Sequence, residues 1–98
     1  MRRTVVRYRV KPQFVDLNVE LVKAVYEELR EADPPGFRYA TFQLDDEVSF
    51  VHVAISESEP PPLPGLEAFR RFQQGIAGRC DEPPAVSEAR EVGSFGFG

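Results

Sequence analysis

The sequence contains a single histidine, His52, whose side chain can exchange a proton near neutral pH. Histidine has an unperturbed pKa close to neutrality, so its imidazole can accept a proton from a substrate at that pH. His52 lies within the apolar segment Val48 to Ile55, which is typical of a β-strand. We take His52 as the candidate catalytic residue. The alternative is a partly buried histidine that is hydrogen-bonded to a carboxylate or to the backbone.

Two arginines, Arg7 and Arg9, stand two residues apart in the first apolar segment, so they share one face of a strand. A guanidinium group donates a planar fork of hydrogen bonds that suits a carboxylate or a phenolate. We expect Arg7 and Arg9 to share a ligand site with His52. The alternative is a structural set of salt bridges, with Glu88 and Glu91 of a neighbouring strand as partners.

Aromatic residues at strand spacing could form the apolar wall of such a site. Tyr39 and Phe50 are the candidates for ligand contact, with Tyr8 and Phe42 beside them. A pocket of this kind would suit a small aromatic or anionic ligand. The alternative is that these rings pack in the hydrophobic core, as aromatic residues with this spacing commonly do.

The remaining motifs predict no further chemistry. Cys80 continues the apolar stripe of the second predicted helix, four residues after Ile76, so we expect a small buried side chain there. A single histidine and a single cysteine far apart do not form a metal-ligand set, and no glycine-rich phosphate loop is present, so we expect no metal and no cofactor. The run Pro61-Pro62-Leu63-Pro64 resembles a proline-rich peptide ligand, but inside a compact domain it predicts a stiff connector.

The elements that would position these residues follow from the apolar periodicity. Alternating or β-branched segments predict strands at Thr4 to Val10, Phe37 to Leu44, Val48 to Ile55 and Ala85 to Val92. Apolar steps of three and four predict one helix carrying the stripe Leu17 to Leu29 and a second from Leu66 to Cys80. The order βαββαβ predicts a ferredoxin-like α+β fold over residues 1–98 as one domain. Its four-stranded antiparallel sheet has the strand order 4-1-3-2, and both helices cover one face.

Length and charge exclude several classes of protein. The chain has 98 residues and a net charge of -4, which argues against a nucleic-acid-binding or membrane-binding function, because both need a basic surface. RNA-recognition domains share the βαββαβ order. Their third-strand motif fails here, since Asp46 and Glu47 replace its basic and glycine positions. One cysteine allows no internal disulfide, and we expect a cytoplasmic protein.

Both faces of the middle strands carry large apolar side chains. Val51, Val53 and Ile55 alternate with Phe50 and Ala54. Two helices can cover only one face of the sheet, so we expect a second copy of the chain to cover the other by two-fold symmetric packing. The face with His52 is assigned to this dimer cavity. We expect the tail Gly93 to Gly98 to pack against the partner, and the alternative is that this tail or the proline loop folds over the open face.

A family resemblance fits this arrangement. The element order, with the segments Gly36 to Asp46 and Val48 to Ala54, resembles the dimeric α/β-barrel superfamily, which includes antibiotic-biosynthesis monooxygenase domains. These segments are similar to small stand-alone bacterial members. The resemblance implies a homodimer and allows oxidation of phenolic, polyketide-type compounds by oxygen without metal or flavin.

Two functions therefore remain open. One is a small homodimeric domain that binds a small molecule or has an accessory role. The other is a cofactor-independent monooxygenase, or a related enzyme, that acts on a small aromatic or enolisable substrate. The chain has no tryptophan, and its only asparagine, Asn18, lies in the first predicted helix rather than on the first strand. Tryptophan and first-strand asparagine are frequent in the sites of the resembling enzymes, so their absence here favours the first function.

Overall fold

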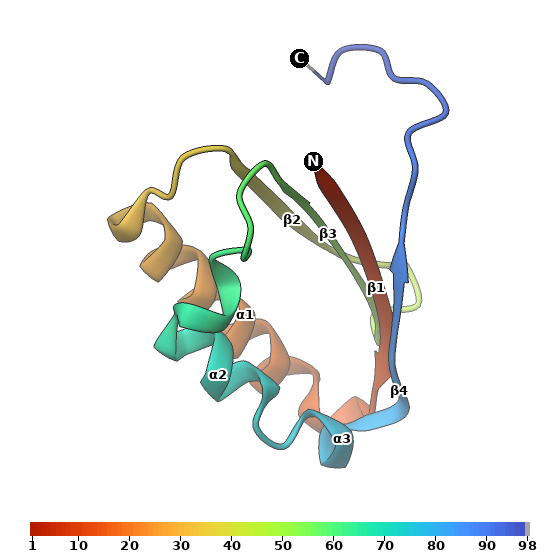
Figure 1. The fold of residues 1–98 in the computed structure, drawn as a ribbon. Coiled ribbons are helices and arrows are strands. Elements are labelled where there is room, and N and C mark those ends of the chain that lie inside the picture. The colour runs from red at the N-terminus through yellow and green to blue at the C-terminus, as the bar shows by residue number, and fades with distance from the viewer. Residues whose placement is uncertain (98) are drawn as a thin grey trace.

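In the computed structural model, which describes residues 1–97, four antiparallel strands form one sheet in the order β2-β3-β1-β4. The strands are β1 (Arg2–Val10), β2 (Phe37–Gln43), β3 (Ser49–Ser56) and β4 (Cys80–Glu88). The helices are α1 (Val15–Ala32), α2 (Glu67–Gln73) and α3 (Ile76–Arg79), with 3-10 turns at η1 (Pro12–Phe14) and η2 (Leu63–Gly65). Figure 1 shows α1 and α2 side by side on one face of the sheet. The predicted ferredoxin-like α+β fold and its strand order are confirmed.

The register of the two central strands decides which side chains face the helices. Val6 of β1 lies opposite His52 of β3, and Tyr8 lies opposite Phe50. Because successive side chains on a strand alternate between faces, these four residues share the face that the helices cover. We call it the inner face. The outer face carries the residues between them, such as Val51.

The core lies between the inner face and the helices. Its fully buried apolar residues come from the sheet (Tyr8, Val10, Phe50, Cys80), from α1 (Val22, Val25), and from η2, α2 and the residue between them (Leu63, Leu66, Ala68, Phe72). The two helices are also joined by polar contacts, because the Glu28 carboxylate of α1 accepts hydrogen bonds from the backbone N–H groups of Glu67 and Ala68. These N–H groups have no partner inside α2, so Glu28 satisfies the start of that helix from outside.

The hairpin between β2 and β3 turns without a glycine. The Asp46 carboxylate accepts hydrogen bonds from the backbone N–H groups of Val48 and Ser49, which holds the turn closed. A hydrogen bond from the Ser49 hydroxyl, together with these backbone bonds, lowers the pKa of Asp46. Glu47 adopts a left-handed backbone with φ of 69°. The predicted hairpin is therefore present, and the Asp46 side chain stabilises its turn in place of a glycine.

The second helix and the last strand differ from their predicted bounds. Helix α2 ends at Gln73, since Gly75 takes a φ of 79° that a continuing helix does not allow. Cys80 is buried as predicted, but it begins β4 rather than ending a helix. Strand β4 contains Pro83 and Pro84, which are tolerated because β4 lies at the edge of the sheet. Its register with β1 shifts at these prolines.

The segment after β4 makes few contacts with the rest of the chain. In Figure 1 it extends away from the sheet, and Phe95 is 97% exposed. Gly98, the last residue of the predicted tail, lies outside the described residues. No helix in the part of the chain that the structure describes is both long enough and apolar enough to cross a bilayer.

We expect Phe50→Ala to lower the free energy of unfolding by about 3–5 kcal/mol, because Phe50 is 2% exposed and stacks on Tyr8 at 5.5 Å between ring centroids. Leu17→Ala on the exposed side of α1 is the control and should change it by roughly 0.5 kcal/mol or less. Urea unfolding followed by circular dichroism measures both. Equal losses in the two variants would contradict the placement of Phe50 in the core.

Candidate functional site

A cavity of about 620 Å³ lies between the inner face of the sheet and the helical layer. Its wall is mostly apolar and aromatic, and it includes residues of all four strands, α2, α3 and the proline-rich loop: Val6, Phe37, Ala54, Pro61, Leu63, Pro64, Phe69, Phe72, Ile76, Pro84 and Val86. Three polar aromatic side chains, Tyr8, Tyr39 and His52, also line it. This size and composition are typical of a site for a small organic molecule.

The structure places His52 on the inner face, with 4% of its surface exposed, and not on the face assigned to a dimer cavity. The sequence pattern correctly predicted which residues of β3 share a face. It did not predict which face the helices cover, because both faces of β3 are apolar. Arg7 and Arg9 lie on the outer face, one position out of phase with Tyr8. The expected convergence of these arginines with His52 therefore does not occur.

The arginine partners also differ from those predicted. Arg9 pairs with Glu82 of β4 at 3.3 Å. Glu88 and Glu91 instead pair with the more N-terminal arginines, Arg2 and Arg3. These exposed pairs support the structural alternative for Arg9, and exposed pairs of this kind contribute little to stability.

The aromatic candidates divide into three groups. Tyr39 and Tyr8 line the cavity, whereas Phe50 stacks beside Tyr8 in the core. Phe42 lies on the outer face and is 55% exposed. Of the predicted site residues, the structure thus brings His52 and Tyr39 together at one cavity, and Phe50 stacks on Tyr8 from the neighbouring strand.

A hydrogen-bond network surrounds the His52 imidazole. Its Nε2 lies 2.8 Å from the Tyr8 hydroxyl, and its Nδ1 lies 2.5 Å from the Tyr39 hydroxyl. Thr41 Oγ1 is a more distant neighbour of Nδ1 at 3.2 Å, and it also bonds the Tyr26 hydroxyl at 2.7 Å. Both ring nitrogens therefore have a hydroxyl partner, which holds the ring in a fixed orientation at the cavity wall.

Two buried residues extend this network away from the cavity. Asn18 of α1 donates from Nδ2 to the Tyr8 hydroxyl at 3.0 Å. Arg79, at the end of α3, donates to Asn18 Oδ1 at 3.4 Å and to the Phe72 carbonyl at 2.7 Å. Sequence reasoning missed both residues as parts of the site, since 61 positions separate Arg79 from Asn18 along the chain. The one available signal was an asparagine on the apolar side of a helix.

Burial determines the charge state of the network. It lowers the pKa of His52 from its ordinary value of 6.5 to about 4, so the imidazole is neutral near pH 7. Burial also raises the pKa of the Tyr8 and Tyr39 hydroxyls above the usual value of 10.0, so both keep their protons. The cavity wall near His52 is therefore uncharged and consists of hydrogen-bonding groups.

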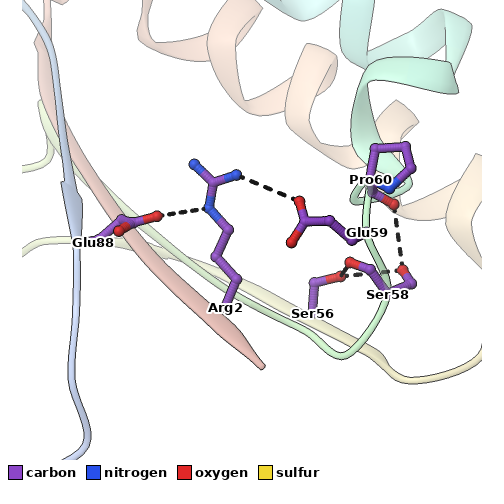
Figure 2. Close-up of polar contacts among 6 residues, drawn as sticks. All are labelled: Arg2, Ser56, Ser58, Glu59, Pro60 and Glu88. Atoms are coloured by element: carbon purple, nitrogen blue, oxygen red, sulfur yellow. Dashed lines mark hydrogen bonds and ion pairs between the residues drawn. The ribbon is translucent and has the colours of Figure 1, made fainter.

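A charged residue, Arg2, lies at the rim of the cavity and pairs with two glutamates. Figure 2 shows Arg2 of β1 between Glu88 of β4, at 3.0 Å, and Glu59 of the proline-rich loop, at 3.9 Å. In the same view the Ser56 hydroxyl donates to the Ser58 carbonyl, which ties the start of this loop to β3. Arg2 is exposed and still lines the cavity, so it marks where the cavity meets solvent.

The arrangement can hold a neutral organic ligand by shape and by hydrogen bonds. His52 and the two tyrosines offer hydrogen bonds at one wall, while aromatic rings provide flat apolar surfaces. Within residues 1–97 no group of three or more histidine, cysteine, aspartate or glutamate side chains is placed to hold a metal ion.

Comparison with known proteins gives structural matches only. No protein-family model matches the chain, and no curated protein does. A crystal structure of an antibiotic biosynthesis monooxygenase matches with a TM-score of 0.76 at 19% identity, covering 95% of this chain and 100% of that one. A protein from Nitrosomonas europaea named for the same activity gives 0.77 at 21% identity, with 94% and 99% covered.

The structure of Rv0793 from Mycobacterium tuberculosis matches similarly, with a TM-score of 0.75 at 16% identity over 95% of this chain and 96% of that one. At these identities the likeness concerns the fold. The predicted resemblance is confirmed at that level: the chain has the ferredoxin-like α+β fold of the antibiotic biosynthesis monooxygenase-like structures.

Proposed function

We propose that this domain binds a small, flat and largely apolar organic molecule in the cavity between its sheet and its helices. The observation that supports this most strongly is the cavity itself, with about 620 Å³ of space and a polar cluster of Tyr8, Tyr39 and His52 at one wall. A few fixed polar groups in an apolar cavity are the usual means of orienting a ligand. A bicyclic aromatic compound with one oxygen substituent fits this description.

The aromatic lining favours a flat ligand. The Tyr39 ring stacks with both Phe37 and Tyr26, at 5.9 and 5.3 Å between centroids, and these contacts restrict its motion. Phe72 approaches the His52 ring at 5.5 Å from the helical layer. A rigid aromatic wall loses little conformational entropy when a ligand binds.

The second candidate function is cofactor-independent oxidation of a phenolic or enolisable compound. Two observations support it: the fold shared with structures named as antibiotic biosynthesis monooxygenases, and a histidine at the cavity wall. A neutral His52 with a pKa of about 4 is a weak base, so the site suits an already ionised substrate better than one that His52 must deprotonate. Oxygen uptake with a phenolic compound, absent in His52→Ala, would favour oxidation over binding alone.

We also propose that the domain is a homodimer through the outer face of the sheet. Support comes from the apolar residues that this face leaves without a helical cover: Val5, Ala40, Phe42, Val51, Val53 and Ile55. Figure 1 shows no element on that side of the sheet. A second copy related by two-fold symmetry would cover such a patch, and the exposed Phe95 and Phe97 of the tail would gain contacts with it.

Tyr39→Phe should weaken binding of 2-acetonaphthone, an aromatic ketone used as a probe, by roughly tenfold, because it removes one hydrogen bond at the cavity wall. Tyr26→Phe is the matched control: Tyr26 stacks on Tyr39 but does not line the cavity, so its loss should change the affinity less than twofold. Isothermal titration calorimetry measures both. No binding by the unaltered protein, or equal effects of the two substitutions, would count against the proposed site.

The free energy of unfolding should fall by about 2–3 kcal/mol between pH 7 and pH 4.5 through His52 alone. The folded state keeps His52 neutral down to about pH 4, whereas the unfolded chain takes up this proton below 6.5. The contribution of His52 to the free energy of unfolding is therefore present above pH 6.5 and is lost as the pH falls toward 4. Urea unfolding at a fixed protein concentration measures the change, and His52→Gln should lack this part of the slope. Identical pH profiles of the two proteins would refute it.

Sedimentation equilibrium near 10 μM should give about 22 kDa, twice the chain mass of 11.1 kDa. Val53→Asp places a charge in the centre of the outer face and should give the single-chain mass, since burying an unpaired carboxylate is costly. Leu17→Asp on α1 is the control and should leave the larger mass unchanged. A monomer in the unaltered protein would remove the dimer from the proposal.

A further inference from the structure

We propose that Arg79 and Asn18 give the buried hydrogen-bond chain a single direction, so that Tyr39 donates its hydroxyl proton into the cavity. The site then selects ligands that present an acceptor oxygen there, such as an aromatic carbonyl or a phenolate. This inference deepens the proposed binding function and rests on it for the ligand class. The direction of the chain itself can be tested without a ligand.

The direction begins at Arg79, which can only donate hydrogen bonds. Its side chain is 6% exposed and is held by the Phe72 and Gln74 carbonyls, at 2.7 and 3.2 Å, with its cation 5.4 Å from the centre of the Phe72 ring. The remaining contact, at 3.4 Å, is with Asn18. An arginine facing an amide requires the amide oxygen on its side, so the NH₂ group of Asn18 must face Tyr8.

Tyr8 transmits this constraint to the histidine. Its hydroxyl accepts the hydrogen bond from Asn18 at 3.0 Å, and it has one proton of its own to donate. Among residues 1–97 the other hydrogen-bond partner of this hydroxyl is His52 Nε2, at 2.8 Å. If Nε2 also carried a proton, the Tyr8 proton would be buried without an acceptor, which is costly. Nε2 is therefore the acceptor.

A neutral imidazole with an unprotonated Nε2 carries its proton on Nδ1. That proton points to the Tyr39 hydroxyl at 2.5 Å rather than to Thr41, which is farther away at 3.2 Å and also bonds Tyr26. Tyr39 then accepts from His52 and retains its own proton. Besides this ring, the Tyr39 hydroxyl has the Thr41 hydroxyl, which also bonds Tyr26, as a neighbour. Its proton can turn from Thr41 to an acceptor in the cavity that Tyr39 lines.

The ligand class follows from this proton. A carbonyl or phenolate oxygen placed against Tyr39 would complete the chain, whereas a ligand without an acceptor would leave the Tyr39 proton with Thr41 as its neighbour after water is expelled. Arg79 and Asn18 do not line the cavity. They act through Tyr8 and His52 and are positioning residues.

Nitrogen-15 NMR of the His52 side chain tests the direction, because a protonated ring nitrogen and an unprotonated one have widely different chemical shifts. In the unaltered protein near pH 7 we expect Nδ1 to be protonated and Nε2 to be unprotonated. Asn18→Asp supplies a carboxylate that accepts from both Arg79 and Tyr8, so the Tyr8 proton turns away from His52. We expect the protonated nitrogen to change from Nδ1 to Nε2. Thr41→Val, which removes the weaker neighbour of Nδ1, is the control and should leave the tautomer unchanged.

Ligand binding tests the second half of the inference with two probes of similar shape. The unaltered protein should bind 2-acetonaphthone at least roughly tenfold more tightly than 2-ethylnaphthalene, which has no acceptor oxygen. In Asn18→Asp the Tyr39 hydroxyl donates to Nδ1 instead, and the preference should fall to about twofold or less. Retention of the tenfold preference in a variant with a reversed tautomer would overturn the link to ligand class.

The direction of the hydrogen-bond chain and the ligand class can be refuted separately. An unprotonated Nδ1 in the unaltered protein would overturn the direction of the chain, and this spectrum is decisive even where Asn18→Asp does not fold. An unchanged tautomer in a folded Asn18→Asp protein would overturn the role of Asn18 and Arg79. If neither probe binds, the proposed function and the ligand class are both overturned, while the tautomer still supports or refutes the direction.

Discussion

The hydrogen bond between His52 and Tyr8 joins the two central strands across the inner face of the sheet, 2.8 Å from ring nitrogen to hydroxyl. Both groups are buried, so each needs its remaining hydrogen bonds from the protein. Asn18 meets this need from α1, and Tyr39 meets it from β2. The polar pair is therefore bonded to α1 through Asn18 and to β2 through Tyr39, and its members Tyr8 and His52 also line the cavity.

The same contacts explain why the cavity is polar at one wall only. The hydroxyl and imidazole groups bond one another. Away from the cavity, Tyr8 accepts a hydrogen bond from Asn18, which in turn accepts one from Arg79. Around them the strands and α2 contribute apolar rings, of which Phe72 contacts both Tyr8 and His52. Such a connected network inside apolar surroundings holds its members in place and leaves few polar atoms unpaired. Among the described side chains the buried Arg79 Nε is one atom without a hydrogen-bond partner.

The fold could be predicted from the sequence because alternation and helical periodicity are local patterns. The strand order, the hairpin and the helical face of α1 followed from them, with bounds that shift by a few residues. The side on which His52 lies could not be predicted, because β3 is apolar on both faces and parity alone does not say which face the helices cover. The contact between Asn18 and Arg79 depends on how α3 turns at Gly75, and no pattern within either segment indicates it.

The prolines of β4 have a consequence for how copies of this domain can meet. Pro83 and Pro84 lie within an edge strand where the register with β1 shifts by one residue, and neither has a backbone N–H. Because successive N–H groups of a strand point to opposite sides, one of the two missing donors lies on the outer edge, and a neighbouring strand would also meet a bent ladder there. Growth of the sheet by strand addition at the β4 edge is thereby discouraged, whereas the opposite edge, β2, contains no proline.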